Sequence, residues 1–301
     1  MLFAGMTTTF AQVPDASGWK EGDDITDKVN WGNLSFMEDD FSGAVENPHW
    51  HFESSAGGPL GYEEHGPSFA EFGFGVFECF NGADEDLYQY VELPAGMYRL
   101  ECQAYYRFGT AWADDPAAFG TAEWKDNAML YASNGIYDID SKEFTAGRTF
   151  QTPLMPRIFP KQTEPLYTTD ETDWKNDGGP YTIDGENIYY GPSSVPGTLR
   201  WFAAGLYGPY DDGEGTKYNT VTFFLTQDGY ARVGITKKDA KDSDSFMATN
   251  FKLYYEGPAD DAVELMALQD EVQQLYDRVV EIADNNVGLL YTLVNDWLGD
   301  E

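Results

Sequence analysis

The feature of the chain that most constrains its fold is a pair of β-strand patterns, each broken by a tight turn. The first spans residues 87–106, with Pro94-Ala95-Gly96 at its turn. Apolar and polar positions alternate along its second arm, as in a half-buried antiparallel strand. The apolar face of this arm carries Tyr98, Leu100, Cys102, Ala104 and Tyr106. The second pattern spans residues 219–235 around Asp228-Gly229, a strong signal for a β-hairpin. Two hairpins are therefore predicted.

Other segments extend this β pattern through most of the chain. Residues 68–77, 127–132 and 250–255 also read as strands, and no amphipathic helix is predicted before position 259. The stretch 108–205 is too long for a loop, and we expect a long insertion that is largely irregular outside the strand at 127–132. The predicted fold is mainly β, an antiparallel β-sandwich of the jelly-roll type over residues 12–257.

The composition changes after Pro258, where a helical segment is predicted over residues 258–301. Its apolar residues are spaced as a heptad repeat and are Leu265, Leu268, Val272, Leu275, Val279 and Ile282. Asp284-Asn285-Asn286 breaks the register, and a second apolar pattern begins at Val287. This arrangement favours an α-helical hairpin that packs on itself or on the sandwich, because a sustained coiled coil needs more than three heptads. The alternative is a stalk or an oligomerisation element.

The charge of the chain excludes two classes of partner. It carries 52 Asp and Glu against 18 Lys and Arg, a net charge of −34. Such a chain repels phosphate backbones and anionic lipid surfaces, so neither nucleic acid nor membrane is an expected partner. Disorder is also excluded, because 42% of the residues are hydrophobic and 16% are aromatic. No stretch approaches the roughly 20 apolar residues of a membrane span.

The N-terminus indicates where the protein is located in or outside the cell. Residues 1–11 resemble the end of a secretory signal peptide, with cleavage expected before Gln12, so we expect a secreted or cell-surface protein. Cys79 and Cys102 both lie in predicted strands. Their positions are compatible with a disulfide between neighbouring strands and equally with two buried thiols.

Several strand signatures resemble a known family. Residues 86–100 and 103–107 resemble the strand–turn–strand segment of galactose-binding-like jelly rolls, which are carbohydrate-binding-module-like domains of secreted and cell-surface proteins of glycan-degrading anaerobic bacteria. Residues 127–134, 153–155 and 249–257 are similar to further strands of that group. The resemblance covers roughly residues 19–257 and implies the fold and a glycan ligand. Thr249 stands where the family usually has Asp, so a structural calcium is not assigned and no cofactor is predicted.

Catalytic motifs are missing from the sequence. It holds no Gly-x-Ser-x-Gly elbow, no His-Glu-x-x-His helix and no P-loop. Among 52 carboxylates some pair will always lie at glycosidase spacing, so paired acids carry no information. His49 and His51 resemble half of a metal site, but no metal is assigned. The chain is predicted not to be an enzyme.

Carbohydrate binding is the sharper prediction. A sugar offers an apolar C–H face to an aromatic ring, and its hydroxyls need a few aimed polar groups. The predicted ligand-binding residues come from the 108–205 stretch and the strand end before it, and they are Trp112, Trp174, Trp124, Arg107 and Tyr189. The acidity favours a neutral glycan. The alternative function is a structural or adhesive surface module with a helical assembly segment and no sugar ligand, in which helices mediate self-association or contact parent-protein domains.

Overall fold

The computed structural model describes residues 13–29, 50–55, 62–63, 75–79, 83–109, 125–138, 140–158, 181–183, 187–192, 195–240 and 244–260. Beyond these it describes residues 264, 268, 272, 275, 278–280, 282 and 286. The chain divides into two compact units, Met1–Gly257 and Pro258–Glu301.

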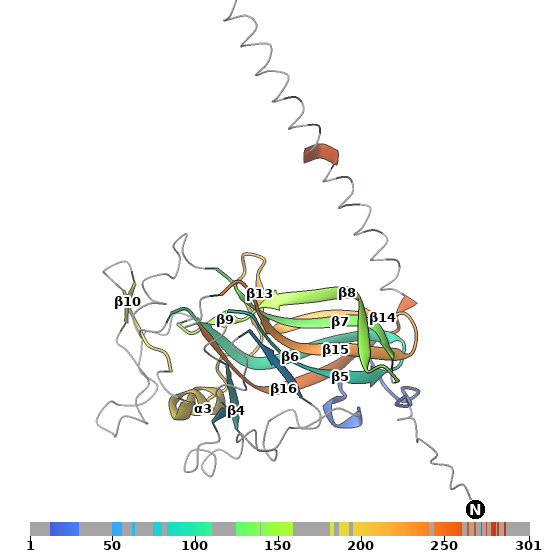
Figure 1. The fold of residues 1–301 in the computed structure, drawn as a ribbon, viewed down its shortest axis with the longest axis horizontal. Coiled ribbons are helices and arrows are strands. Elements are labelled where there is room, and N and C mark those ends of the chain that lie inside the picture. The colour runs from blue at the N-terminus through green and yellow to red at the C-terminus, as the bar shows by residue number, and fades with distance from the viewer. Residues whose placement is uncertain are drawn as a thin grey trace, which may run out of the picture. The chain divides into compact units, whose positions relative to one another are not determined.

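The first unit is a β-sandwich of two main sheets (Figure 1). One sheet of seven strands has the order β14-β6-β16-β4-β3, with β1 paired to β16 and β9 to β6. Its strands are β1 Asp23–Asp24, β3 Tyr62–Glu63, β4 Val76–Cys79, β6 Gly96–Arg107, β9 Met155–Pro156, β14 Thr220–Leu225 and β16 Ser245–Gly257. The other sheet has the order β2-β5-β15-β7-β8. Its strands are β2 His51–Ser54, β5 Glu85–Leu93, β7 Ala128–Asp138, β8 Glu143–Pro153 and β15 Gly229–Lys237. The antiparallel β-sandwich is confirmed.

Several small elements complete this unit. They are the 3-10 helix η1 Thr26–Lys28, the pair β10 Tyr181–Ile183 and β11 Asn187–Tyr189, the helix α3 Val195–Ala203, and the pair β12 Tyr210–Asp211 and β13 Lys217–Tyr218. Within the described residues no helix is long and apolar enough to span a membrane.

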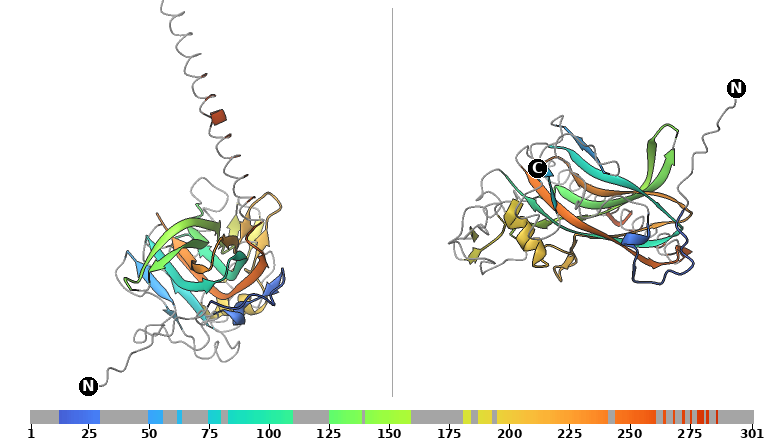
Figure 2. Two further views of the ribbon diagram at one scale, coloured as in Figure 1. Left: turned by 90° about the vertical axis from the view of Figure 1, so that its right-hand side faces the viewer. Right: turned by 90° about the horizontal axis from the view of Figure 1, so that it is seen from below.

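The hydrophobic core lies between the two sheets, and strand alternation fills it. All five residues of the predicted apolar face of β6, from Tyr98 to Tyr106, belong to this core. The five-stranded sheet contributes residues such as Leu87 and Val91 of β5 and Val233 of β15. In the second view of Figure 2 the two layers of strands lie over one another, with the core between them. Because side chains alternate along each strand, every main strand also presents a second, outward face.

The two predicted hairpins are wrong, although their strands are confirmed. The arms of the first, β5 and β6, belong to different sheets, and so do the arms of the second, β14 and β15. Each arm pairs instead with an arm of the other turn, since β5 pairs with β15 and β6 with β14. The Ala95 N–H donates to Asp228 Oδ1 at 2.9 Å, which ties the two turns together. Each arm of each turn has one apolar face. The two arms of a turn lie in different sheets, so their apolar faces are buried against each other across the core.

The expectation of a largely irregular stretch at 108–205 is wrong for residues 133–153. These residues continue β7 and form β8, and the two strands pair as an antiparallel hairpin within the five-stranded sheet. Their register shifts between Ser133 and Gly135, where Asn134 Oδ1 accepts the Arg148 N–H at 2.7 Å. This part of the chain is therefore framework of the sandwich.

A helix that the sequence reading missed covers part of the outer face of the seven-stranded sheet. α3 lies beside β4 (Figure 1), and its Leu199, Trp201 and Phe202 form a second buried cluster with outward side chains of the sheet. Those side chains are Val76, Tyr105, Met155 and Met247. The helix is nine residues long and includes Pro196 and Gly197, which hide its periodicity.

The two cysteines do not form a disulfide. Cys79 and Cys102 are free and buried, and β16 lies between their strands β4 and β6. The sequence is compatible with a disulfide or with two buried thiols, and the structure shows two buried thiols.

In Pro258–Glu301 the described residues from Asp260 to Asn286 are helical. The second apolar pattern, which begins at Val287, lies outside the described residues.

Candidate functional site

The outward face of the five-stranded sheet carries an unusual concentration of aromatic rings. Side chains alternate between the two faces of a strand. Leu87, Val91 and Val233 point into the core, so the residues next to them in the sequence point outward. We call the resulting surface the tyrosine face, and it consists of His51, Glu53, Asp86, Tyr88, Tyr90, Tyr131, Tyr137, Phe144, Tyr230 and Arg232. All five strands of the sheet contribute to it.

The rings of the tyrosine face form a continuous chain across the sheet. The centroids of His51 and Tyr88 lie 5.1 Å apart, and those of Tyr88 and Tyr90 lie 5.5 Å apart. Tyr90 lies 4.6 Å from Tyr137 and 5.4 Å from Phe144, and Tyr137 lies 5.2 Å from Tyr230. Such contacts lie within the range of favourable aromatic pairs, so each ring helps to hold its neighbours in place.

An ion pair lies at one end of this aromatic chain. Arg232 Nη2 is 2.8 Å from Asp86 Oδ2, and the guanidinium carbon lies 3.5 Å from the centroid of Tyr88. Tyr131 donates its hydroxyl hydrogen to Asp86 Oδ1 at 2.8 Å, and Tyr88 donates to Glu53 Oε1 at 2.8 Å. Charge, ring stacking and hydrogen bonds thus fix the orientation of Arg232, although 23% of its side chain is still exposed.

Gly234 leaves space for this arrangement at the centre of the sheet. It lies opposite Tyr88 on one side and Tyr131 on the other. A Cβ at this position would lie 2.0 Å from the Leu87 carbonyl oxygen and 2.8 Å from the Tyr88 Cα, so only glycine fits there. The two tyrosines therefore have no side chain between them on the intervening strand.

The ionisation of the site follows from its partial burial. Burial raises the pKa of Asp86 to about 6, against the opposing effects of Arg232 and Tyr131. Burial likewise raises the pKa values of Tyr88 and Tyr131, so both phenols stay protonated at neutral pH. At neutral pH the face presents neutral hydroxyls, one guanidinium and carboxylates that accept hydrogen bonds.

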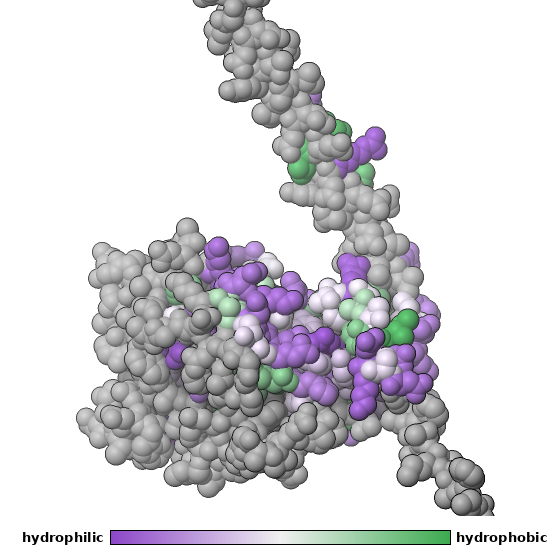
Figure 3. All heavy atoms as spheres, viewed as in Figure 1, coloured by the Kyte–Doolittle hydropathy of each residue, from purple (hydrophilic) through white to green (hydrophobic). Residues whose placement is uncertain are grey.

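The chemistry available at this face is recognition of a ligand with both apolar and hydroxyl surfaces. Tyr90, Tyr137 and Tyr230 are half-buried, so their rings are fixed but still meet solvent. Figure 3 shows that the described surface of the sandwich in that view is mainly hydrophilic, with small separate hydrophobic areas. Fixed rings beside aimed polar groups are the combination that a sugar requires.

The predicted site residues fall elsewhere. Trp112, Trp124 and Trp174 lie outside the described residues. Arg107 ends β6 and is half-buried in the seven-stranded sheet, opposite Ser245 in the register. Tyr189 ends β11 in the small β10–β11 pair. Neither Arg107 nor Tyr189 belongs to the strands that build the tyrosine face.

The sequence reading missed the tyrosine face because tyrosine is ambiguous in an alternating strand. In the segment Asp86-Leu87-Tyr88-Gln89-Tyr90-Val91 both alternating sets contain large residues, and a tyrosine suits either the core or the surface. An acid does not separate the two sets, because Asp86 begins the outward set and Glu85, which is fully buried, begins the inward one. The strand therefore offered no local signal for the tyrosine face.

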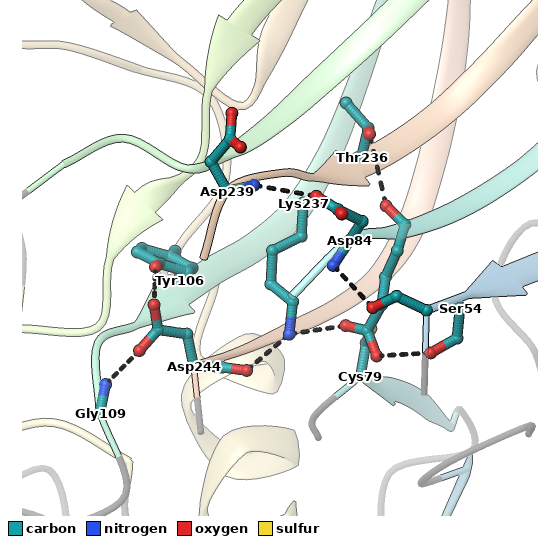
Figure 4. A network of polar contacts seen from close by, with 11 residues as sticks. Ser54, Cys79, Asp84, Tyr106, Gly109, Thr236, Lys237, Asp239 and Asp244 are labelled. Carbon is teal, nitrogen blue, oxygen red and sulfur yellow. Dashed lines mark hydrogen bonds and ion pairs between the residues drawn. The ribbon is translucent and has the colours of Figure 1, made fainter. Parts of the chain in front are cut away.

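A second polar cluster lies inside the sandwich and has a structural character (Figure 4). Lys237 Nζ lies 2.6 Å from Glu85 Oε2 and donates to the Asp244 carbonyl oxygen at 2.6 Å, and both side chains of the ion pair are fully buried. Cys79 donates its thiol hydrogen to the same Glu85 oxygen at 2.5 Å. The Asp244 carboxylate accepts hydrogen bonds from Tyr106 and from the Gly109 N–H. The cluster joins strands of both sheets.

This buried cluster is not suited to nucleophilic chemistry. Burial, and then the charge of Glu85, raise the pKa of Cys79 well above its ordinary value, so the thiol stays protonated. Among the described residues no group of three or more His, Cys, Asp and Glu side chains is arranged to hold a metal ion. The cluster therefore links the two sheets through a buried ion pair and buried hydrogen bonds.

Comparisons with known proteins add little to this geometry. No protein-family model matches the chain, and no curated protein matches it. Among solved structures, the carbohydrate recognition domain of Emp47p aligns with 74% of this chain and 94% of its own length, at 11% identity and a TM-score of 0.26. A similarity of that size carries no argument about function. The functional assignment of this chain therefore depends on the tyrosine face itself.

Proposed function

We propose that the chain is a non-catalytic carbohydrate-binding module of an exported or cell-surface protein, and that it binds glycan on the tyrosine face. One observation carries the proposal: a chain of mutually packed rings, most of them half-buried, crosses all five strands beside the oriented Arg232–Asp86 pair. Rings stack against the C–H faces of sugars, while the guanidinium and carboxylates bond to hydroxyls.

The charges favour a neutral glycan. Arg232 is paired with Asp86, and Glu53 lies beside Tyr88, so the face itself carries no excess of positive charge. The whole chain has a net charge of −34, which repels polyanionic chains over the Debye length of about 10 Å at ~0.1 M salt. Trp112 and Trp174 remain predicted contacts for the same ligand.

The test is a binding measurement with neutral oligosaccharides. A glycan array identifies a ligand, and isothermal titration calorimetry then compares the unaltered chain with Tyr90→Ala and Tyr137→Ala. We expect each substitution to weaken binding about two- to tenfold, because an aromatic stacking contact contributes about 0.5 to 1.5 kcal/mol beyond the area it buries.

The outer face of the other sheet offers a matched control. There Arg99 lies over Tyr254, with 4.2 Å between the guanidinium carbon and the ring centroid, and Arg99 Nε is 2.7 Å from Glu256 Oε1. Tyr254→Ala removes the same kind of ring beside the same kind of ion pair, and it should leave glycan binding unchanged. Equal losses in Tyr254→Ala and Tyr137→Ala would contradict the proposed site. Loss in Trp112→Ala and Trp174→Ala alone would move the site to those residues.

The alternative function, a structural or adhesive module that assembles through its helical segment, is favoured by a separate observation. The described apolar heptad side chains of that segment are exposed. Self-association through them would not require a sugar ligand.

A further inference from the structure

The helical segment exposes a regular apolar stripe. Its described members are spaced by 4, 3, 4 and 3 residues, and each side chain is between 53% and 63% exposed. They are Leu268, Val272, Leu275, Val279 and Ile282. We call these residues, together with Asn286 at the next heptad position, the helical seam. Large aliphatic side chains that are exposed at each described stripe position from Leu268 to Ile282 mark a surface for another helix.

We propose that the helical seam forms a parallel two-stranded coiled coil with the seam of a second copy of this chain. The residue types select this occupant. Val272 and Val279 occupy a positions, Leu268 and Leu275 occupy d positions, and Ile282 occupies the last d position. The β-branched residues at a, with leucine at two of these three d positions, favour two parallel strands. The apolar repeat ends at Ile282, and Asn286 occupies the next a position, where a single polar residue can specify register and oligomer state at a cost in stability.

The area available fits a dimer of modest affinity. Burial of an aliphatic side chain of this size removes about 60 to 120 Å² from water. Two copies contribute five such side chains each, and since these are 53% to 63% exposed, roughly 350 to 700 Å² of apolar surface is available to bury. Stable specific interfaces begin near ~1,200 Å² in total, so we expect a concentration-dependent dimer.

The charge of the segment gives the dimer a distinctive salt dependence. Residues 258–301 contain 11 Asp and Glu and 1 Lys or Arg, which gives 1 − 11 = −10. Two such segments side by side repel one another, and salt screens that repulsion. Dimer affinity should therefore rise when the Debye length falls from about 30 Å at ~0.01 M salt to about 8 Å at ~0.15 M.

The experiment is sedimentation velocity on the full chain over a range of protein and salt concentrations. We expect a species of twice 33.7 kDa that grows with both concentrations. Leu275→Glu places a charge in the seam and should weaken the dimer more than about 100-fold. Val280→Glu is the matched control, because Val280 is also helical and 40% exposed but lies outside the stripe. It should leave the dimer intact.

A crosslinking measurement tests the parallel orientation. In a parallel dimer the two copies of residue 275 face each other, so Leu275→Cys should oxidise to a disulfide-linked dimer, while Val280→Cys should not. The native Cys79 and Cys102 are buried and do not compete. A chain that stays monomeric, or a Leu275→Glu variant that still dimerises, would overturn the proposal. So would a monomer that loses thermal stability on Leu275→Glu, because the seam would then be covered by its own chain.

Discussion

The two outer faces of the sandwich are both rich in aromatic residues, but they treat them differently. On the seven-stranded sheet Tyr105 packs with Trp201 and Phe202 of α3 and with Tyr207, and all four are buried. On the five-stranded sheet Tyr90, Tyr137 and Tyr230 are only half-buried. The rings of the seven-stranded sheet pack against a covering segment, whereas Tyr90, Tyr137 and Tyr230 of the five-stranded sheet remain in contact with solvent.

The hydroxyl groups show what this difference means. Tyr105 shares a hydrogen bond with Thr198 at 2.8 Å, and Tyr207 donates to the Arg157 carbonyl oxygen, so both hydroxyls of the covered face are bonded within the fold. On the tyrosine face the hydroxyls bond to carboxylates near the surface, where a ligand can compete for them. An aromatic residue can therefore be assigned to packing or to recognition only when its partners are known.

The largest expected effect comes from emptying the covered face. Trp201→Ala removes a buried ring and should lower the free energy of unfolding by about 3 to 5 kcal/mol. Tyr137→Ala, on the open face, should lower it by about 1 kcal/mol or less. Urea denaturation followed by fluorescence measures both. Equal losses would show that the tyrosine face is also part of the packed core.

Almost as large a contrast is expected between the two ion pairs. Lys237→Met leaves the fully buried Glu85 without its cation and should cost about 3 to 5 kcal/mol of unfolding free energy. Arg232→Met opens the partly exposed pair with Asp86, for which about 1 kcal/mol or less is expected. Chemical denaturation of the two variants compares them. A larger loss for Arg232→Met would make that pair a structural element instead of a recognition element.

A smaller effect concerns binding. Arg232→Lys keeps the charge but loses the planar group that stacks on Tyr88, so we expect glycan affinity to fall about three- to tenfold with little change in stability. Arg99→Lys makes the same change over Tyr254 on the other sheet and serves as the control. Calorimetric titration of both variants gives the comparison, and an unchanged affinity in Arg232→Lys would remove the guanidinium from the site.

The smallest effect is a dependence on pH. Because the pKa of Asp86 is about 6, acidification below that value protonates the carboxyl and releases Arg232 from its ion pair. Glycan binding should then weaken a few-fold from pH 7 to pH 5, and Asp86→Asn should bind weakly at both pH values. The raised pKa also means that the folded chain binds this proton more readily than the unfolded chain. The stability contribution of Asp86 should therefore fall as pH rises from about 4 to about 6.

The sequence predicted strands and helix well where a pattern had a single interpretation. The alternation from Tyr98 to Tyr106 and the heptad from Leu268 to Ile282 each match only one element type. Pairing was not predictable from the same pattern. An apolar face on both arms of a turn is equally compatible with edge-to-edge pairing and with two arms facing across a core, as β5 and β6 do.

The candidate site was less accessible to sequence reasoning. Trp112 and Trp174 stand out in the sequence because Pro, Gly and Asp surround them, whereas the tyrosine face lies on regular strands. Its residues come from positions 51 to 232 of the chain, and they meet only through the pairing of β2, β5, β15, β7 and β8. Long-range strand pairing is the information that a single sequence does not display.

The position of β16 has a consequence for how the chain is made. β16 is the last strand of the sandwich in the sequence, yet it lies inside the seven-stranded sheet between β6 and β4. From the end of β6 at Arg107 to the end of β16 at Gly257, a ribosome must add 150 residues. At about 5 to 20 residues per second, the nascent chain spends roughly 8 to 30 s with those two strand edges unpaired. During that interval the edges of β4 and β6 are open to other chains, and binding by a chaperone would protect the half-built sheet until its central strand arrives.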